Sequence, residues 1–213
     1  MKKSFVWENM EFEISNVNAV ITKLNNEEVL KVERDLDALP FDQNNMSKTV
    51  DEPTFVKLSG YNIKDGIVEV KVLSRLLMDA PDFARGFIGI AFRINEDNSS
   101  YESIYLRPTN SRCDDQLRRN HTVQYYSYPN HKFDFLRNNS MGEYETYADI
   151  GLNEWITTRI EIQDKEAKLF LNDYIYTSFI VSEMKGNLES GSIGFWVEIG
   201  TEGYFKDLKI TKK

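Results

Sequence analysis

Alternation of apolar and other residues at every second position runs through most of this 213-residue sequence. Such a pattern is typical of β-strands with one buried face, because successive side chains of a strand point to opposite sides. Turn-forming residues separate the alternating stretches. The sequence therefore predicts an all-β fold, with strands centred on residues 68–73, 87–93, 103–107, 156–162, 167–172 and 193–198.

Signals for helices are weak. Residues 73–84 and 181–188 can each hold no more than a short helical turn, and the polar stretch 35–53 is expected to be a long loop. Many short strands joined by turns are typical of a sandwich or barrel. No linker, repeat or low-complexity tract divides the chain. We expect residues 1–213 to form one β-sandwich domain of two antiparallel sheets.

Composition excludes several classes of protein. Cys113 is the only cysteine, so the chain has no internal disulfide and no cysteine-based zinc site. A net charge of -8 and a pI of about 5.0 argue against nucleic-acid binding. No apolar run approaches the roughly 18 residues of a membrane span. Lys2 and Lys3 resemble the start of an export signal, but Glu8 interrupts the apolar stretch that should follow. The sequence thus predicts a cytoplasmic protein or the processed form of a secreted one.

The carboxy-terminal half resembles a known superfamily. It has four alternating segments separated by turns, at residues 155–162, 167–172, 191–196 and 203–210. Their order is similar to that in the concanavalin A-like lectin/glucanase superfamily, in its laminin-G-like branch. Residues 65–70 and 89–93 fit the same plan. The resemblance implies a jelly-roll β-sandwich. It leaves function open, because the superfamily contains lectins, glucanases, lyases and adhesion modules.

One internal segment differs in charge from the rest of this acidic chain. Residues 107–137 contain six basic and three acidic side chains, as well as both histidines. Tyrosines lie within the segment and beside it. Guanidinium groups bind carboxylates and sulfates through paired hydrogen bonds, and tyrosine rings stack on sugars. The segment therefore predicts a binding site for a polar or acidic glycan.

Strand parity indicates which side chains share a face. If Ile88, Ile90 and Phe92 point into the core, then Gly89, Ala91 and Arg93 point outward. The same rule places a polar and aromatic set on the outward face of the next two strands. The predicted ligand-binding residues are Arg93, Tyr105, Arg107, Arg112, Gln124 and Tyr126. The alternative is that the charged side chains form ion pairs that hold long loops in place.

Catalysis is the second hypothesis. The Glu-x-Asp-x-x-Glu motif of laminarinase-type glucanases is missing, although Glu143, Glu145 and Asp149 would share a face of one strand. A polysaccharide lyase needs an Arg, Gln or Asn to neutralise a uronate carboxylate and a Tyr or His as acid and base. The catalytic candidates are His121, Tyr126 and Glu145.

No cofactor is expected, although calcium is bound in many laminin-G-like and lectin domains. Candidate calcium ligands are Asp97, Asn98, Asp114, Asp115 and Asp207, at spacings that match no calcium motif. Three functions remain open from the sequence. These are a glycan-binding module, a glycoside hydrolase or polysaccharide lyase that uses the same groove, and a protein-interaction domain.

Overall fold

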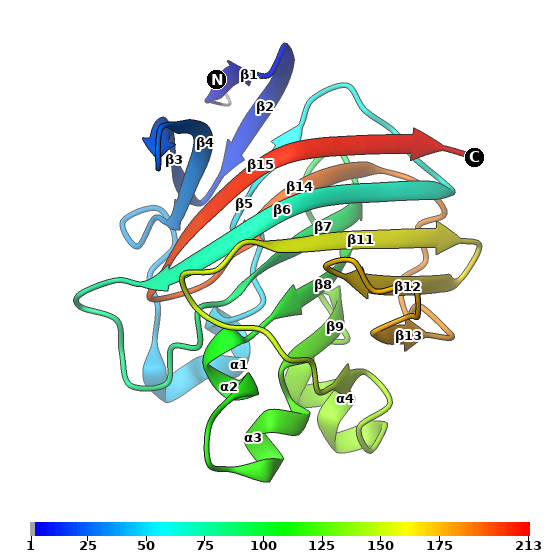
Figure 1. Ribbon diagram of the computed structural model, residues 1–213. Helices are drawn as coiled ribbons and strands as arrows, with labels where there is room; N and C mark the ends of the chain where they lie inside the picture. Colours follow the sequence, from blue (N-terminus) through cyan, green and yellow to red (C-terminus); the bar gives the residue numbers. More distant parts are fainter. Residues whose placement is uncertain (1–2) are drawn as a thin grey trace.

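The computed structural model describes residues 3–213, and its strands form two packed sheets (Figure 1). Met1 and Lys2, the start of the basic amino-terminal sequence, lie outside the described residues. The first sheet has the spatial order β1 (Ser4–Trp7), β2 (Met10–Ser15), β5 (Phe55–Leu58), β14 (Ser192–Val197), β7 (Ile88–Ile94), β8 (Tyr101–Leu106), β9 (Val123–Tyr128) and β10 (Glu145–Thr146). The second sheet has the order β13 (Phe179–Val181), β12 (Glu166–Leu171), β11 (Ile156–Gln163), β6 (Gly66–Leu76), β15 (Thr201–Lys212), β4 (Glu27–Arg34) and β3 (Val17–Leu24).

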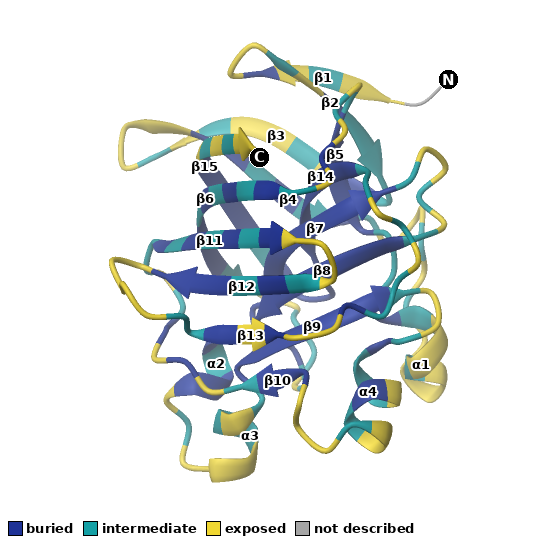
Figure 2. Ribbon diagram, turned by 90° about the vertical axis from the view of Figure 1, so that its right-hand side faces the viewer, coloured by how far each residue is buried: buried dark blue, intermediate teal, exposed yellow. Residues whose placement is uncertain are grey.

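All neighbouring strands within residues 3–213 pair antiparallel. The predicted sandwich of two antiparallel sheets is therefore confirmed. Its core lies between the sheets, where the buried strand faces meet (Figure 2). Phe195 of the first sheet stacks on Phe205 of the second with ring centroids 4.7 Å apart. This packing fixes which face of the first sheet points away from the core.

Short helices gather beyond one edge of the first sheet (Figure 1). They are η1 (Gln43–Asn45), α1 (Met46–Thr49), α2 (Pro108–Ser111), α3 (Gln116–Asn120) and α4 (Phe133–Asn139). The predicted loop over residues 35–53 is confirmed apart from η1 and α1. After β6 ends at Leu76, residues 77–84 form two hydrogen-bonded turns, in which Ala80 N–H donates to the carbonyl of Leu77 and Ala84 N–H to that of Pro81. The helical turn allowed at residues 181–188 does not form. No helix within residues 3–213 is long and apolar enough to span a membrane.

Alternation along four strands builds the outer face of the first sheet. Trp196 pairs with Gly89, Gly89 with Tyr105, and Tyr105 with Gln124. The rings of Trp196 and Tyr105 approach to 4.8 Å between centroids across Gly89. A Cβ at position 89 would lie 2.5 Å from Cβ of Tyr105, so only glycine fits there. The glycine lets two large rings form one aromatic surface.

Candidate functional site

The outer face of the first sheet carries a cavity of about 210 Å³ near the short helices. Trp196, Tyr105 and Phe87 contribute its aromatic floor. One wall is the segment of residues 40–54, which we call the strap, and another is α4 with Phe133. The remaining lining comes from α2, α3 and the segment before β7. The cavity is thus assembled from parts of the chain that are far apart in sequence.

Arg107 is the central charged group of this cavity. Only 5% of the residue is exposed. Its Nη1 donates to the carbonyl of His121 at 3.0 Å and to Oε1 of Gln124 at 3.3 Å, and its Nη2 donates to the Tyr105 hydroxyl at 2.5 Å. The guanidinium also lies against the rings of Tyr105 and Phe133. All these partners are uncharged, which leaves a buried positive charge without an ion pair in residues 3–213.

Arg85 and Arg118 line the same cavity with a similar lack of acidic partners. Arg85 Nη1 donates to the carbonyls of Asp82 and Ala84, and Arg118 Nε and Nη2 lie 3.4 Å from Oδ1 of Asn110. In the described part of the chain, neither guanidinium has a carboxylate within 4 Å. Burial lowers the pKa of Arg85, and the positive charges of Arg118 and Arg107 lower it further. Three arginines therefore repel one another around a single cavity.

Arg137 and His121 form the side of the cavity that faces β10. Arg137 donates from Nε and Nη2 to the two carboxylate oxygens of Glu145, at 3.1 and 2.8 Å. His121 Nδ1 lies 2.7 Å from Oε2 of the same carboxylate. Burial and the nearby arginines lower the pKa of His121, although Glu145 opposes that shift. The imidazole is consequently neutral at neutral pH and lies next to a carboxylate.

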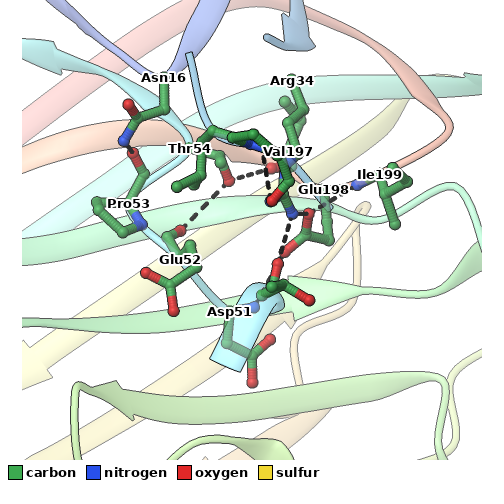
Figure 3. Close-up of polar contacts among 12 residues, drawn as sticks. Asn16, Arg34, Asp51, Glu52, Pro53, Thr54, Val197, Glu198 and Ile199 are labelled. Atoms are coloured by element: carbon green, nitrogen blue, oxygen red, sulfur yellow. Dashed lines mark hydrogen bonds and ion pairs between the residues drawn. The ribbon is translucent and has the colours of Figure 1, made fainter. Parts of the chain in front are cut away.

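Asp51 and Glu198 are the acidic residues of the cavity lining. Glu198 forms a buried ion pair with Arg34 and accepts hydrogen bonds from the backbone N–H groups of Asp51 and Ile199 (Figure 3). Burial nevertheless raises the pKa of Glu198. Burial also raises the pKa of Asp51 to about 7, despite the backbone N–H of Phe133 and the charge of Arg107, which lower it.

The charges in the cavity do not cancel. Arg34 neutralises Glu198, and Glu145 neutralises Arg137. Asp51 can balance only one of the three remaining arginines, Arg85, Arg107 and Arg118, and does so only above its pKa of about 7. At least two positive charges are left facing an aromatic cavity. Such a site suits a ligand that offers both a ring face and an anionic group.

Hydrogen bonds hold the strap firmly against the end of β14 (Figure 3). The backbone N–H of Val197 donates to the carbonyl of Thr54, and the Thr54 hydroxyl donates back to the carbonyl of Val197. The Trp196 indole N–H donates to the carbonyl of Glu52. Lys132, next to α4, pairs with the Glu52 carboxylate. The strap wall of the cavity is therefore tied to the sheet and to α4.

Three predicted ligand-binding residues, Tyr105, Arg107 and Gln124, meet in the structure. Tyr105 and Arg107 line the cavity, whereas Gln124 is fully buried behind Arg107 and supports it. Tyr126 lies on the same sheet face but under the strap. It is fully buried, and its hydroxyl bonds to that of Tyr101, which donates to the carbonyl of Asp51. The Tyr126 ring is thus covered by protein and absent from the cavity lining.

Arg93 lies apart from the other predicted residues, at the far end of β7. Its backbone has φ of +51° at an irregularity in the pairing of β7 with β14. The guanidinium therefore turns toward the second sheet, where it donates to the carbonyls of Lys64, Asp164 and Leu188. Asp65 lies 3.7 Å away. The expected outward orientation beside Gly89 and Ala91 is wrong, because alternation fails at a bulge.

Arg112 also lies outside the cavity, and the predicted carboxylate run is divided between the cavity wall and the surface. Arg112 is exposed and pairs with Asp149 at 2.7 Å and Glu154 at 3.1 Å. Of the run 143–149, only Glu145 and Thr146 are in a strand. Glu145 is buried at the cavity wall while Asp149 pairs with Arg112 on the surface. The shared carboxylate face expected for Glu143, Glu145 and Asp149 is therefore wrong.

The candidate calcium ligands are dispersed. Asp97 accepts from Ser99, Asn98 accepts from Lys57, and Asp207 pairs with Lys71. Asp115 accepts from the backbone N–H of Arg118 at the start of α3. Among the described residues, no three His, Cys, Asp or Glu side chains lie close enough together to hold a metal ion.

Sequence reasoning missed Asp51, Arg85, Phe133, Trp196 and Glu198. Alternation places Trp196 opposite the core-facing Phe195, and that signal was available. The same alternation places Glu198 on the face of Trp196, whereas Asp51, Arg85 and Phe133 lie in loops or at element ends, where no periodicity indicates a direction.

Comparisons with solved structures agree with this architecture. A carbohydrate-binding module from Bacillus subtilis, CBM66, superposes with a TM-score of 0.57 at 12% identity, covering 92% of this chain and 96% of the module. A Bacillus subtilis protein of unknown function with a galectin-like fold has a TM-score of 0.51 at 9% identity, over 92% and 87% of the two chains.

The predicted jelly-roll β-sandwich fold is thereby confirmed. Nothing in these similarities points to the laminin-G-like branch. No protein-family model matches the sequence, and no curated protein matches it.

Proposed function

We propose that this protein binds an acidic glycan in the cavity over Tyr105 and Trp196. The observation that carries the proposal is the set of three guanidinium groups, Arg85, Arg107 and Arg118, which line the cavity without a carboxylate partner in residues 3–213. Removing a charge from water is costly unless a counter-charge compensates it. A carboxylate or sulfate on the ligand would supply that compensation.

The aromatic floor accounts for the sugar part of the ligand. Tyr105, Trp196 and Phe87 offer an apolar surface on which the face of a sugar ring can pack. Hydrogen-bonding groups surround this surface, as in most small-molecule sites. The fold is shared with a carbohydrate-binding module, which is consistent with a glycan ligand.

Titration calorimetry with oligogalacturonates, heparin-derived oligosaccharides and neutral cello-oligosaccharides tests the proposal. Acidic oligosaccharides should bind, and binding should weaken with added salt because charges are screened over about 10 Å at 0.1 M. Arg107→Met should weaken binding about thirtyfold, equivalent to about 2 kcal/mol for a lost charge-assisted hydrogen bond. Arg112→Met is the matched control, because Arg112 lies on the surface and pairs with Asp149 and Glu154.

The proposal fails if neither acidic series binds, and a protein partner would then be the better hypothesis for this face. It also fails if Arg107→Met stays folded and binds as tightly as the parent protein. Unchanged affinity in high salt would remove the electrostatic part of the argument.

A second candidate function, β-elimination on the same ligand, has one specific observation in its favour. His121 is poised as a neutral base, with Nδ1 against Glu145 and a pKa lowered mainly by burial. In that reaction the base takes the proton next to the uronate carboxylate, and the bond to the leaving oxygen breaks. A carbon–carbon double bond forms, and the leaving oxygen takes up the proton that His121 removed from carbon.

Ultraviolet absorbance of the unsaturated product distinguishes a lyase from a binding module. An assay for new reducing ends without that absorbance would indicate a hydrolase instead. His121→Gln should abolish elimination and retain binding. Absence of both signals at saturating oligogalacturonate leaves a binding function alone.

A further inference from the structure

A second cavity, of about 830 Å³, adjoins the first on the side of α3 and β10. Three side chains line both cavities, namely Arg118, His121 and Arg137. The second cavity is completed by the end of α3, the segment after α4, β10 and Tyr147. The two hollows are therefore neighbours that share a wall of cationic and imidazole groups.

The shared wall has hydrogen-bonding capacity left. Arg118 uses Nε and Nη2 on Asn110, and Arg137 uses Nε and Nη2 on Glu145. Within residues 3–213, neither Nη1 group has an acceptor. Glu145 lines the second cavity, but Arg137 and His121 already occupy its carboxylate. An anion in the second cavity would thus meet donors rather than a free negative charge.

Tyr147 supplies an aromatic surface beyond the wall. It is 39% exposed and lines the second cavity. Arg119 lies over its ring at 5.2 Å and donates from Nη2 to the Tyr147 hydroxyl at 3.3 Å. Arg119 has no carboxylate partner in the described part of the chain. The pair repeats the arrangement of Tyr105 and Arg107, in which a guanidinium lies over the ring and bonds to the hydroxyl.

Exposed apolar side chains form the rim of the second cavity. Leu117 of α3 is 67% exposed and Met141, after α4, is 96% exposed, and both line the hollow. Exposed apolar residues next to a cavity are a common feature of binding surfaces. They would pack against the apolar faces of a bound chain.

We propose that the ligand is an acidic oligosaccharide chain, with one unit in the first cavity and a following unit against Tyr147 in the second. This inference rests on the proposed function, because it extends the same binding site. Each cavity offers a tyrosine ring, Tyr105 in the first and Tyr147 in the second, beside arginine side chains, so each suits one acidic sugar unit. Arg118 and Arg137 lie between them and bind the anionic groups of both units.

The dependence of affinity on the length of the oligosaccharide tests this inference independently of the proposed function. We would measure binding of galacturonate by NMR titration, and of di-, tri- and hexagalacturonate by calorimetry, with heparin-derived oligosaccharides as the sulfated series. Affinity should rise sharply from the monosaccharide to the short oligomers and then level off. Tyr147→Ala should remove about tenfold of the gain for oligomers, as expected for a lost aromatic contact, and leave the monosaccharide unchanged.

Two further variants control this experiment. Tyr147→Phe should retain most of the gain, because the ring remains. Tyr61→Ala removes a partly buried tyrosine that has Lys212 over its ring and lies outside both cavities, and it should not change affinity. Tyr147 is exposed, so its replacement leaves the core packing intact.

The inference is overturned if affinity does not depend on chain length, or if Tyr147→Ala weakens monosaccharide and oligomer equally. Either result leaves the proposed function standing, provided that Arg107→Met still weakens binding of every ligand. If no member of either series binds, both the proposed function and this inference are wrong.

Discussion

Two buried arginines lie at opposite ends of neighbouring strands, and their surroundings differ. Arg93 ends β7 and is enclosed by three backbone carbonyls and Asp65. Arg107 follows β8 and has uncharged partners on one side and a cavity on the other. Both are at least 95% buried, so burial alone does not separate a structural arginine from a functional one. The two kinds of arginine differ in whether a counter-charge lies beside the guanidinium.

The largest effect on stability is expected at Arg93. Arg93→Met should lower the free energy of unfolding by about 3 kcal/mol, because it leaves three partly buried carbonyls without their donor and Asp65 without its nearby positive charge. Denaturant titration measures the loss. Glycan affinity of the folded fraction should stay unchanged, and a variant as stable as the parent would show that Arg93 is not structural.

Substitution of Asp51 is expected to have the next largest effect on stability, and this effect depends on pH. The pKa of Asp51 is about 7 in the folded state and near 4 in the unfolded state, so the carboxyl stays protonated to a higher pH in the folded state. Stability from this group is fully present below the unfolded pKa and is lost as pH rises through 7. Asp51→Asn removes the titration, and its stability relative to the parent should increase by about 2 kcal/mol between about pH 5 and about pH 8.

Comparing pH values isolates the titration from other effects of the substitution. Asp51 has φ of +53°, a conformation that asparagine also tolerates well, so any backbone contribution is the same at every pH. Thermal unfolding of both proteins across this pH range is the measurement. A constant difference would mean that Asp51 does not titrate there.

Arg107→Met should change stability much less than Arg93→Met, by about 1 kcal/mol or less. Methionine can keep the packing against Tyr105 and Phe133 while removing an uncompensated charge. Denaturant titration of the two variants in parallel tests the contrast. If Arg107→Met is as destabilising as Arg93→Met, Arg107 is a structural residue and the proposed difference between the two arginines is wrong.

Arg112→Ala is expected to have the smallest effect on stability. Its pairs with Asp149 and Glu154 are exposed, and exposed ion pairs contribute about 0.5 kcal/mol. Neither stability nor glycan binding should change beyond that amount. A large loss of binding with a normal melting curve would place Arg112 in the site after all.

The fold was largely predictable from the sequence because alternation is a local signal. Strands β6, β7, β8, β11, β12 and β14 all lie where the period-2 pattern predicts them. Helices α2, α3 and α4 were not predicted, since four to seven residues are too few to show a helical period. The sequence predicted a loop over residues 35–53, but it did not predict that this loop covers Tyr126.

The candidate site was only partly predictable. Charge inversion over residues 107–137 led to Arg107, and strand parity led to Tyr105. Arg93 was misplaced because a bulge reverses its direction. Asp51 and Glu198 come from distant parts of the chain, and only tertiary packing brings them to the same wall.

The wide spread of the cavity lining along the chain, from Met46 to Ile199, has a practical consequence. A bound molecule would hold the strap, the end of β8 with the segment before β7, and α4 together as a reversible cross-link. Anything that binds only the folded state raises its melting temperature, by an amount set by concentration and dissociation constant. Unlabelled compounds can thus be ranked by thermal shift alone, before any guess is made about which of them the protein meets in its natural setting.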